Sequence, residues 1–236
     1  MTFGKKPVAV FRHSAGEGPG YFATFLDARS IPWQLIKVDE GHSIPLSAKD
    51  FSGLCFMGGP MSVNDDLPWI QPVLALIREA ASIQIPVIGH CLGGQLMAKA
   101  LGGTVSRNHV KEIGWGRVEP TTPTAAEWLG EVKAFEAFHW HGETFSLPPG
   151  ATRILKSRYC ENQAYVIGNC LGMQCHVEMT DAMIRLWNRT WAAENVTPGP
   201  SIQSTEEMYV DMQERIAAMR SVADRLYSRW ILGLRD

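Results

Sequence analysis

The sequence lacks the features that would place it in a membrane or on nucleic acid. Every apolar run falls short of the roughly 20 residues that span a bilayer. The 22 lysine and arginine residues nearly balance the 24 aspartate and glutamate residues, so no basic surface for nucleic acid is predicted. Residues 1–6 lead into an apolar stretch without the hydrophobic region of a signal peptide. We therefore expect a cytoplasmic protein that binds neither a membrane nor nucleic acid.

Cysteine is also scarce, with 5 residues, an odd number. Cys160, Cys170 and Cys175 lie close together but lack the paired spacing of structural zinc sites. His139 and His141 share one face of a predicted strand, and no third metal ligand is evident beside them. We therefore expect reduced thiols, no metal and no cofactor.

The first half of the chain alternates between strand-like and helix-like stretches. Strands are predicted over 7–11, 33–38, 51–57 and 86–88, and helices over 21–29, from Pro68, and from the turn at Cys91 to Gly102. Such alternation is typical of a parallel sheet covered by helices on both faces. The sequence therefore predicts an α/β fold with an open, mostly parallel, three-layer arrangement.

The second half of the chain is richer in short strands separated by turns. These strands are predicted over 114–118, 134–140, 153–156, 164–168 and 171–176. A helix follows from its N-cap at Thr180 to Trp191, a loop covers 195–200, and a long helix starts at the capping box of Ser204 and Glu207 and ends near Trp230. No repeat or long linker interrupts the chain. We expect a single domain over 1–236, with a motif-bearing core over 8–181 and a C-terminal helical segment over 204–231.

The run Gly-His-Cys-Leu-Gly-Gly-Gln at 89–95 is the most informative stretch of the sequence. It places Cys91 at a sharp turn between a strand and a helix. Free backbone N–H groups and the positive helix end favour a thiolate at such a turn. A buried structural cysteine is the alternative, but Gly89, Gly93 and Gly94 suit a strained turn with close packing. The pattern favours a nucleophile for acyl transfer through a thioester.

A cysteine nucleophile needs a base and a group that orients the base. His176 and Glu178 follow an apolar strand at alternate positions, so their side chains share a face if the chain is extended there. The carboxylate could then fix the tautomer of the imidazole and stabilise its charged form. Two unrelated polar residues at the end of a strand would look the same, so the pair alone decides nothing.

Three segments together carry a resemblance to a known family. The run at 89–95 resembles the G-x-C-x-G-x-Q signature of class I (triad-type) glutamine amidotransferases, 173–178 resembles their Q-F-H-P-E box, and 56–62 resembles their oxyanion-strand turn. The segments occur in the family's order, and the resemblance covers most of the chain. The segment at 138–143 and the lack of a fused synthetase make the chain similar to a stand-alone form of the GMP synthase amidotransferase domain. The resemblance implies a flavodoxin/Rossmann-like sheet.

The resemblance also implies a glutaminase reaction, in which the side-chain amide of glutamine is hydrolysed to glutamate and ammonia through a cysteine thioester. It assigns roles to particular residues: Cys91 as nucleophile, His176 as general base and then acid, Glu178 as the orienting group, the backbone N–H groups of Gly59 and Leu92 as the oxyanion hole, and Gln95 and Gly142 as substrate contacts. No metal is implied.

The sequence departs from the family pattern at three positions. Val177 replaces the usual proline between the histidine and the glutamate, Cys175 replaces a phenylalanine, and Met61 stands where some members have a second glycine. None of these changes removes a catalytic group. Val177 could loosen the turn that presents Glu178, and Met61 could reshape the mouth of the site. These departures therefore affect the prediction of the substrate more than the prediction of the mechanism.

Several alternatives remain open from the sequence. The chain has no Walker A run and no S-G-G-x-D loop, so use of the ammonia would require a synthetase partner chain. A γ-glutamyl peptidase that cleaves glutathione-like amides would use the same residues, and a non-catalytic regulatory role is a less favoured possibility. Arg12 and His13 are expected to line the mouth of the site. The apolar stripe of the last helix is expected to dock on the sheet, and the oligomeric state is left undetermined.

Overall fold

The computed structural model describes residues 6–191 and 197–235 of the chain. Residues 1–5, which precede the first predicted strand, lie outside the described residues. The same holds for residues 195–196 of the predicted loop.

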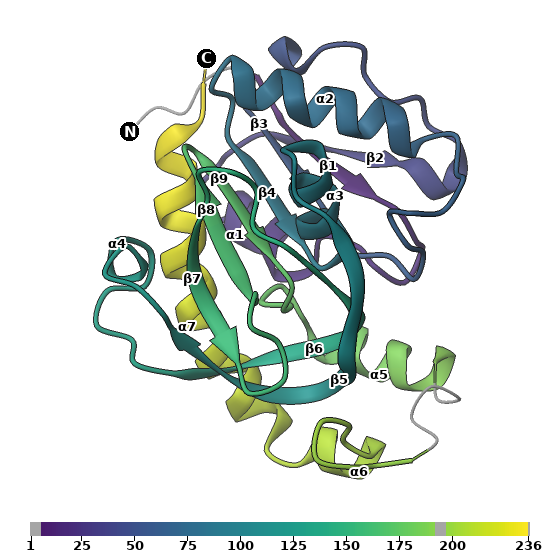
Figure 1. Ribbon diagram of the computed structural model, residues 1–236, viewed down its shortest axis with the longest axis vertical. Coiled ribbons are helices and arrows are strands. Elements are labelled where there is room, and N and C mark those ends of the chain that lie inside the picture. The colour runs from purple at the N-terminus through teal and green to yellow at the C-terminus, as the bar shows by residue number, and fades with distance from the viewer. Residues whose placement is uncertain (1–5, 192–196, 236) are drawn as a thin grey trace.

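One mixed sheet of nine strands organises the described residues (Figure 1). The strands lie in the order β2-β1-β3-β4-β9-β8-β7-β5-β6. Neighbouring strands are parallel from β2 to β9 and antiparallel from β9 to β6. Their bounds are β1 Val8–Arg12, β2 Trp33–Lys37, β3 Gly53–Phe56, β4 Val87–His90, β5 Val105–Pro120, β6 Phe135–Phe145, β7 Thr152–Ser157, β8 Ala164–Ile167 and β9 Cys170–Met173.

Helices cover both faces of the parallel part of the sheet (Figure 1). In β1, Val8 and Val10 pack into one core with residues of α1 and α7, whereas Ala9 and Phe11 pack into the other core with residues of α2 and α3. Successive side chains of a strand point to opposite faces, so a strand buried on both faces reads as an unbroken apolar run. The predicted three-layer α/β fold is confirmed.

The helices agree with most of the predicted positions. Their bounds are α1 Gly20–Asp27, α2 Ile70–Ser82, α3 Leu92–Ala100, α4 Ala125–Leu129, α5 Asp181–Thr190, α6 Thr205–Tyr209 and α7 Met212–Trp230. Short 3-10 turns cover Val38–Glu40, Ala48–Asp50 and Ile231–Gly233. The side chain of Thr180 accepts a hydrogen bond from the backbone N–H of Met183, as expected of an N-cap. The short helix α4 was not predicted, because five residues give little periodicity.

The prediction of one long C-terminal helix is wrong. The capping box of Ser204 and Glu207 is present, but it begins the short helix α6. Val210 is extended and Asp211 has a φ of 51°, and α7 starts only after this break. Aspartate tolerates this left-handed conformation better than most residues. The break lets the apolar stripe of α7 turn onto the sheet, and its residues Met212, Ile216 and Met219 are buried there.

The antiparallel part of the sheet is longer than predicted and reaches the site. β5 extends well beyond the predicted 114–118, because the polar residues before it hide its strand character in the sequence. β6 is joined to the segment after β9 by a bridge, in which the backbone N–H of His176 donates to the carbonyl of Phe138 at 2.8 Å. This bridge ties the middle of β6 to the segment that carries the predicted base. No helix among the described residues is long and apolar enough to cross a membrane.

Candidate active site

Cys91 occupies a strained turn between β4 and α3. Its φ of 49° and ψ of −107° lie in a region that residues other than glycine rarely adopt. The neighbouring glycines allow the helix to start this abruptly, because a Cβ atom on Gly93 would lie 2.0 Å from the carbonyl oxygen of Phe56 and one on Gly94 would lie 2.3 Å from that of Met173. The glycines of the 89–95 run thus let α3 begin against the ends of β3 and β9.

The loop after β3 lies against this turn. A Cβ atom on Gly59 would come within 2.6 Å of the side chain of Leu92, the first residue of α3. Gly59 also lines the same cavity as Cys91. The two residues predicted to supply oxyanion donors are therefore neighbours of one another, and Leu92 directly follows Cys91, although it is not among the residues that line the cavity.

His176 and Glu178 form a buried pair. The distance from His176 Nδ1 to Glu178 Oε1 is 2.7 Å, and both side chains are about 1% exposed. Burial opposes charge on each group, but each stabilises the charge of the other. The pKa of Glu178 is lowered to about 2, mainly by the charge of His176 acting against burial. Against the effect of burial, the charges of Glu178 and Cys91 raise the pKa of His176 well above its usual value.

A second contact reaches the sulfur atom of Cys91 from Gln174. The side-chain amide of Gln174 donates to Cys91 Sγ at 3.4 Å, and its oxygen accepts from Gln95 Nε2 at 3.1 Å. Nε2 of His176 has no hydrogen-bond partner among the described residues, although Cys91 lies near enough to act on its charge. The family box at 173–178 includes Gln174, but reasoning from the sequence assigned it no role.

His90 lies behind the pair, on the side away from the cavity. Its ring nitrogen Nε2 is 3.0 Å from the hydroxyl of Tyr227 on α7 and 3.9 Å from Glu178 Oε2. Burial lowers the pKa of His90, so it is neutral at pH 7. No local pattern in the sequence indicates that His90 contacts α7, which is distant along the chain.

The wall of the cavity at Cys91 contains three tryptophans that pack on one another, Trp140, Trp187 and Trp191, which we call its aromatic end, and polar residues that include Gln95, His141 and Glu143, which we call its polar end. It is lined by Glu17, Gly59, Pro60, Met61, Ser62, Cys91, Gln95, Lys111, Ile113, Trp140, His141, Gly142, Glu143, Trp187 and Trp191. Both predicted substrate contacts, Gln95 and Gly142, are therefore present in its wall. The ring of Trp187 packs edge-on against His176, with the ring centres 4.9 Å apart.

Arg12 and His13 do not line this cavity, so that expectation is wrong. The guanidinium of Arg12 pairs with Asp39 at 2.8 Å and with Glu40 at 2.6 Å, in the 3-10 turn that follows β2. The Nδ1 atom of His13 lies 3.1 Å from the carbonyl oxygen of Met57, and burial lowers the pKa of His13 to about 4. Arg12 ends β1 and His13 follows it at the carboxyl edge of the sheet, but both side chains contact partners outside the cavity.

Glu17 is a residue of the site that sequence reasoning missed. It follows β1 in a glycine-rich loop, is 5% exposed, and lines the cavity with Cys91. Burial raises the pKa of Glu17 to about 7, and the charge of His176 partly offsets this effect. The only signal in the sequence was an acidic residue in a polar loop at the carboxyl edge of the sheet, which is too common to single out.

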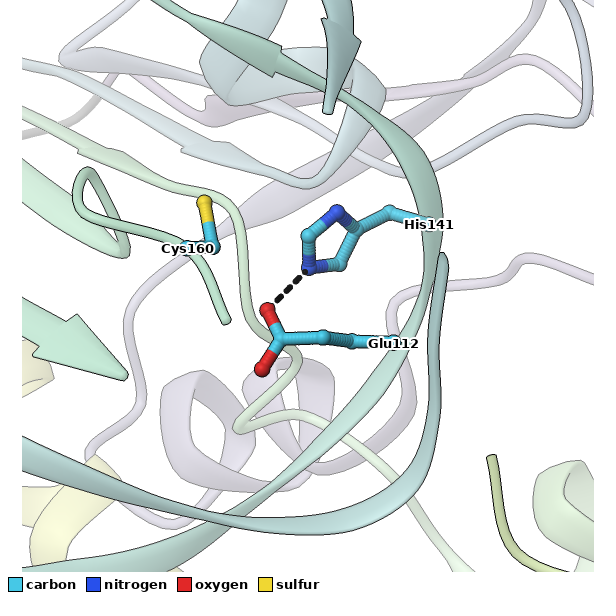
Figure 2. A group of neighbouring side chains, drawn as sticks. All are labelled: Glu112, His141 and Cys160. Carbon is cyan, nitrogen blue, oxygen red and sulfur yellow. Dashed lines mark hydrogen bonds and ion pairs between the residues drawn. The ribbon is translucent and has the colours of Figure 1, made fainter. Parts of the chain in front are cut away.

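A second group of titratable side chains lies under the polar end of the cavity. Figure 2 shows Glu112 and His141 pointing toward one another from β5 and β6, with Cys160 beside them. Glutamate, histidine and cysteine are ligands that zinc accepts. In this structure they form hydrogen bonds: Glu112 is 3.1 Å from His141 Nε2 and accepts from Ser157 at 2.8 Å. Burial raises the pKa of Cys160 to about 11, which leaves its thiol protonated at pH 7.

The remaining contacts of this cluster explain its position. Gln163 donates to Glu112 at 2.7 Å, and the other ring nitrogen of His141 is 3.0 Å from the carbonyl oxygen of Glu143. Burial acts to raise the pKa of Glu112. Hydrogen bonds from His141 and Ser157, together with the charges of His139 and His141, nevertheless hold this pKa below its usual value. The network braces β5, β6 and the loop after β7 beneath the cavity. The expectation that the protein uses no metal stays a prediction.

Comparisons with known proteins agree on one family. The family model described as glutamine amidotransferase class-I matches residues 25–183. A putative glutamine amidotransferase-like protein, YfeJ of Salmonella typhimurium, is 31% identical over 179 residues, which cover 71% of this chain and 74% of the relative. The crystal structure of a glutamine amido transferase from Methylobacillus flagellatus is 48% identical, with a TM-score of 0.94 and coverage of 98% of this chain and 96% of that one.

Another relative contains further sequence beyond the matched part. A glutamine-hydrolyzing GMP synthase of Lactobacillus gasseri is 31% identical over 133 residues, which are 55% of this chain but only 25% of that protein. The match therefore spans about a quarter of that relative's length.

Proposed function

Because the chain belongs to the class-I glutamine amidotransferase family, we propose that it hydrolyses the side-chain amide of glutamine to glutamate and ammonia. One observation carries the proposal: the buried pair of His176 and Glu178 lies beside Cys91 at a strand-to-helix turn. A thiol nucleophile, a base and a group that orients the base are what amide cleavage through a thioester requires.

In the first proposed step, the thiolate of Cys91 attacks the amide carbon, and the carbonyl oxygen becomes an oxyanion. The backbone N–H groups of Gly59 and Leu92 hold this oxyanion, and one such donor is typically worth about 3 kcal/mol. Protonated His176 gives its Nε2 proton to the nitrogen of the departing group. The C–N bond breaks, ammonia leaves, and the γ-glutamyl group remains on Cys91 as a thioester.

In the second proposed step, water replaces ammonia beside His176. The now neutral imidazole takes a proton from this water as the oxygen attacks the thioester carbon. The C–S bond breaks, glutamate leaves, and Cys91 returns as a thiolate beside a protonated His176. Throughout, Glu178 accepts the hydrogen bond from Nδ1–H and stabilises the imidazolium.

The polar end of the cavity is the proposed place of the glutamyl group. Gln95 lies there and also holds Gln174, which donates to the sulfur of Cys91, so Gln95 would act on both the substrate and the nucleophile. At Gly142, a Cβ atom would come within 3.3 Å of the side chain of Lys111. The absence of a side chain there keeps the backbone of β6 accessible to the substrate.

The acceptor of the ammonia would lie on another chain. One relative, from Sulfolobus acidocaldarius, is named as one of the subunits of a glutamine-hydrolyzing GMP synthase, and it is 30% identical over 134 residues, 69% of its length. This name supports the proposal of a synthetase partner in trans. The expected cytoplasmic location and the single domain over 1–236 are proposals of the same kind.

A γ-glutamyl peptidase is the second candidate, and one observation favours it. The aromatic end of the cavity, formed by Trp140, Trp187 and Trp191, offers apolar surface beside His176, where the leaving group departs. Ammonia has no apolar part to contact such a wall, whereas the amine half of a larger γ-glutamyl amide does.

The test of the proposed function measures glutamate release by the purified chain, with glutamine and glutathione as parallel substrates and Cys91→Ala as the control. Turnover of glutamine identifies a glutaminase and directs the search to a synthetase partner. Turnover of glutathione with little turnover of glutamine identifies the chain as a γ-glutamyl peptidase instead of a glutaminase. Equal turnover by the Cys91→Ala variant contradicts both.

A further inference from the structure

Glu17 is a buried acid at the site that the three-residue mechanism leaves without a role. It is 5% exposed and lines the same cavity as Cys91. Among the described residues no group donates a hydrogen bond to its carboxylate, and the charges that act on it most strongly belong to His176 and Glu178. A buried carboxylate without a donor is costly, so its presence beside a nucleophile needs an explanation.

The position of the carboxylate is close to the edge of the imidazole. A Cβ atom added to Gly58 would lie 1.8 Å from Glu17 Oε2 and 3.2 Å from His176 Cε1. Both side chains therefore border the open side of this glycine, with the two atoms no more than about 5 Å apart. Cε1 lies between the two ring nitrogens, and Nδ1 is already held by Glu178, so Nε2 is the ring nitrogen near this carboxylate that has no hydrogen-bond partner among the described residues.

The loop that carries Glu17 is held by the site itself. Trp187, which packs on the ring of His176, donates from Nε1 to the carbonyl oxygen of Gly16 at 2.8 Å. The backbone N–H of Glu17 donates to the carbonyl of Ser14 at 3.0 Å, and at the start of α1 the backbone N–H of Tyr21 donates to the carbonyl of Glu178 at 2.8 Å. One set of contacts thus fixes Glu17 relative to His176 and Glu178.

We propose that Glu17 accepts a hydrogen bond from an N–H of the scissile amide and thereby makes the site selective for γ-glutamyl amides over γ-glutamyl esters. This inference rests on the proposed function. When the thiolate adds, the amide nitrogen becomes pyramidal and its lone pair must face the Nε2 proton of His176. A carboxylate that accepts one of the N–H bonds holds the nitrogen in that orientation.

The proton and bond changes of the reaction are otherwise as described above. The C–S bond forms, the C–N bond breaks, and the proton gained by the nitrogen comes from His176. Glu17 forms no covalent bond and transfers no proton. The oxygen of an ester leaving group has no hydrogen to donate, so Glu17 offers it no comparable interaction.

The test compares Glu17→Gln with the wild-type chain on glutamine and on the γ-methyl ester of glutamate. The value kcat/KM is measured for each, because it reports formation of the thioester and excludes the hydrolysis that both substrates share. We expect kcat/KM for glutamine to fall roughly 10-fold, because the uncharged amide oxygen of the variant accepts a weaker hydrogen bond than the carboxylate does, while the ester value stays within about 3-fold.

The control variant is Glu119→Gln, an exposed acid paired with Arg117 away from the cavity, and it should change neither value. Equal losses on the amide and the ester would overturn the inference, because a contact to the glutamyl part or a purely structural role affects both substrates alike. An unchanged amide value would overturn it as well.

If Glu17→Gln fails to fold, Glu17→Asp keeps the charge and withdraws it by one methylene group, and the amide value should again fall more than the ester value. Failure of the proposed function looks different: the wild-type chain would then release glutamate from neither substrate, and the inference would fall with it. Turnover of both substrates, with no selective effect at Glu17, would overturn the inference alone.

Discussion

The backbone of Cys91 is held in a conformation that favours glycine, and the side chain is nevertheless a cysteine. Strain of this kind typically costs about 1–3 kcal/mol and persists where surrounding structure enforces it. Here the enforcement comes from the glycines that let α3 pack on the ends of β3 and β9. The residue best suited to stability at this position is therefore not the one that the proposed chemistry requires.

The first prediction separates strain from chemistry at Cys91. Cys91→Ala and Cys91→Gly should both abolish amide hydrolysis, because each removes the sulfur atom. Cys91→Gly should have a free energy of unfolding about 1–3 kcal/mol above that of Cys91→Ala, since glycine relieves the strained φ and ψ. Urea unfolding of the two variants measures this difference. Equal stabilities would contradict the strain.

The second prediction orders the roles of the buried pair. His176→Ala should lower kcat more than Glu178→Gln does, by roughly 10- to 100-fold, because His176 would carry protons and Glu178 would only orient and stabilise it. Steady-state rates with glutamine give the comparison. Losses of equal size, or a larger loss in Glu178→Gln, would rule out this division of roles.

The third prediction concerns stability and pH at Glu17. Folding raises the pKa of Glu17 from the ordinary 4.5 to about 7, so the native state binds this proton more tightly than the unfolded state does. The wild-type chain should therefore lose stability relative to Glu17→Gln as the pH rises from 4.5 through 7. The full change is about 3 kcal/mol.

Urea unfolding of both proteins at pH values between 4.5 and 8 measures this difference. A constant difference across that range would show that Glu17 titrates normally in the native protein. A penalty at neutral pH would fit an acid retained at the site for its chemistry rather than for stability.

At the scale of elements, α7 reaches the site from the far end of the chain. Its residue Tyr227 contacts His90, whose Nε2 lies 3.9 Å from Oε2 of Glu178, the carboxylate oxygen that does not bind His176. β4 therefore supplies a buried histidine that connects the site to α7. A helix that the sequence marked only as an apolar stripe also contributes a polar group behind the proposed triad.

The fourth prediction tests this connection. Tyr227→Phe removes the hydroxyl and leaves Nε2 of His90 buried without its partner, so the free energy of unfolding should fall by about 1–3 kcal/mol. Tyr209→Phe is the matched control, because Tyr209 is only partly buried and contacts Arg185 through its ring. Guanidinium unfolding of both variants gives the comparison. A loss no larger than that of the control would mean that this contact contributes little.

At the scale of the whole molecule, the mixed sheet brings the parts of the site together. The parallel strands place the Cys91 turn, the Gly59 loop and the loop of Glu17 at one edge, because parallel strands end on the same side. The antiparallel strands β5 and β6 then extend past this edge and form the opposite wall of the cavity. Each part comes from a different region of the sequence.

Much of the fold could be predicted from local sequence patterns. The parallel strands, the turn at Cys91 and the two helix caps agree with the structure, because each depends on residues next to one another in the chain. The break at Asp211 could not be predicted, since it depends on where α7 docks. The full length of β5 was also missed, because its pairing with β6 compensates for its polar sequence.

The sequence by itself determined the three motifs, their order and the family resemblance that they carry, because these are properties of neighbouring residues. Only the tertiary structure decided that Arg12 pairs with Asp39 and that Glu17 and His176 both border Gly58. It also decided that His90 lies between Tyr227 and Glu178 and contacts the hydroxyl of Tyr227. These contacts join residues far apart along the chain, and the folded sheet, rather than any local pattern, sets the distances between them.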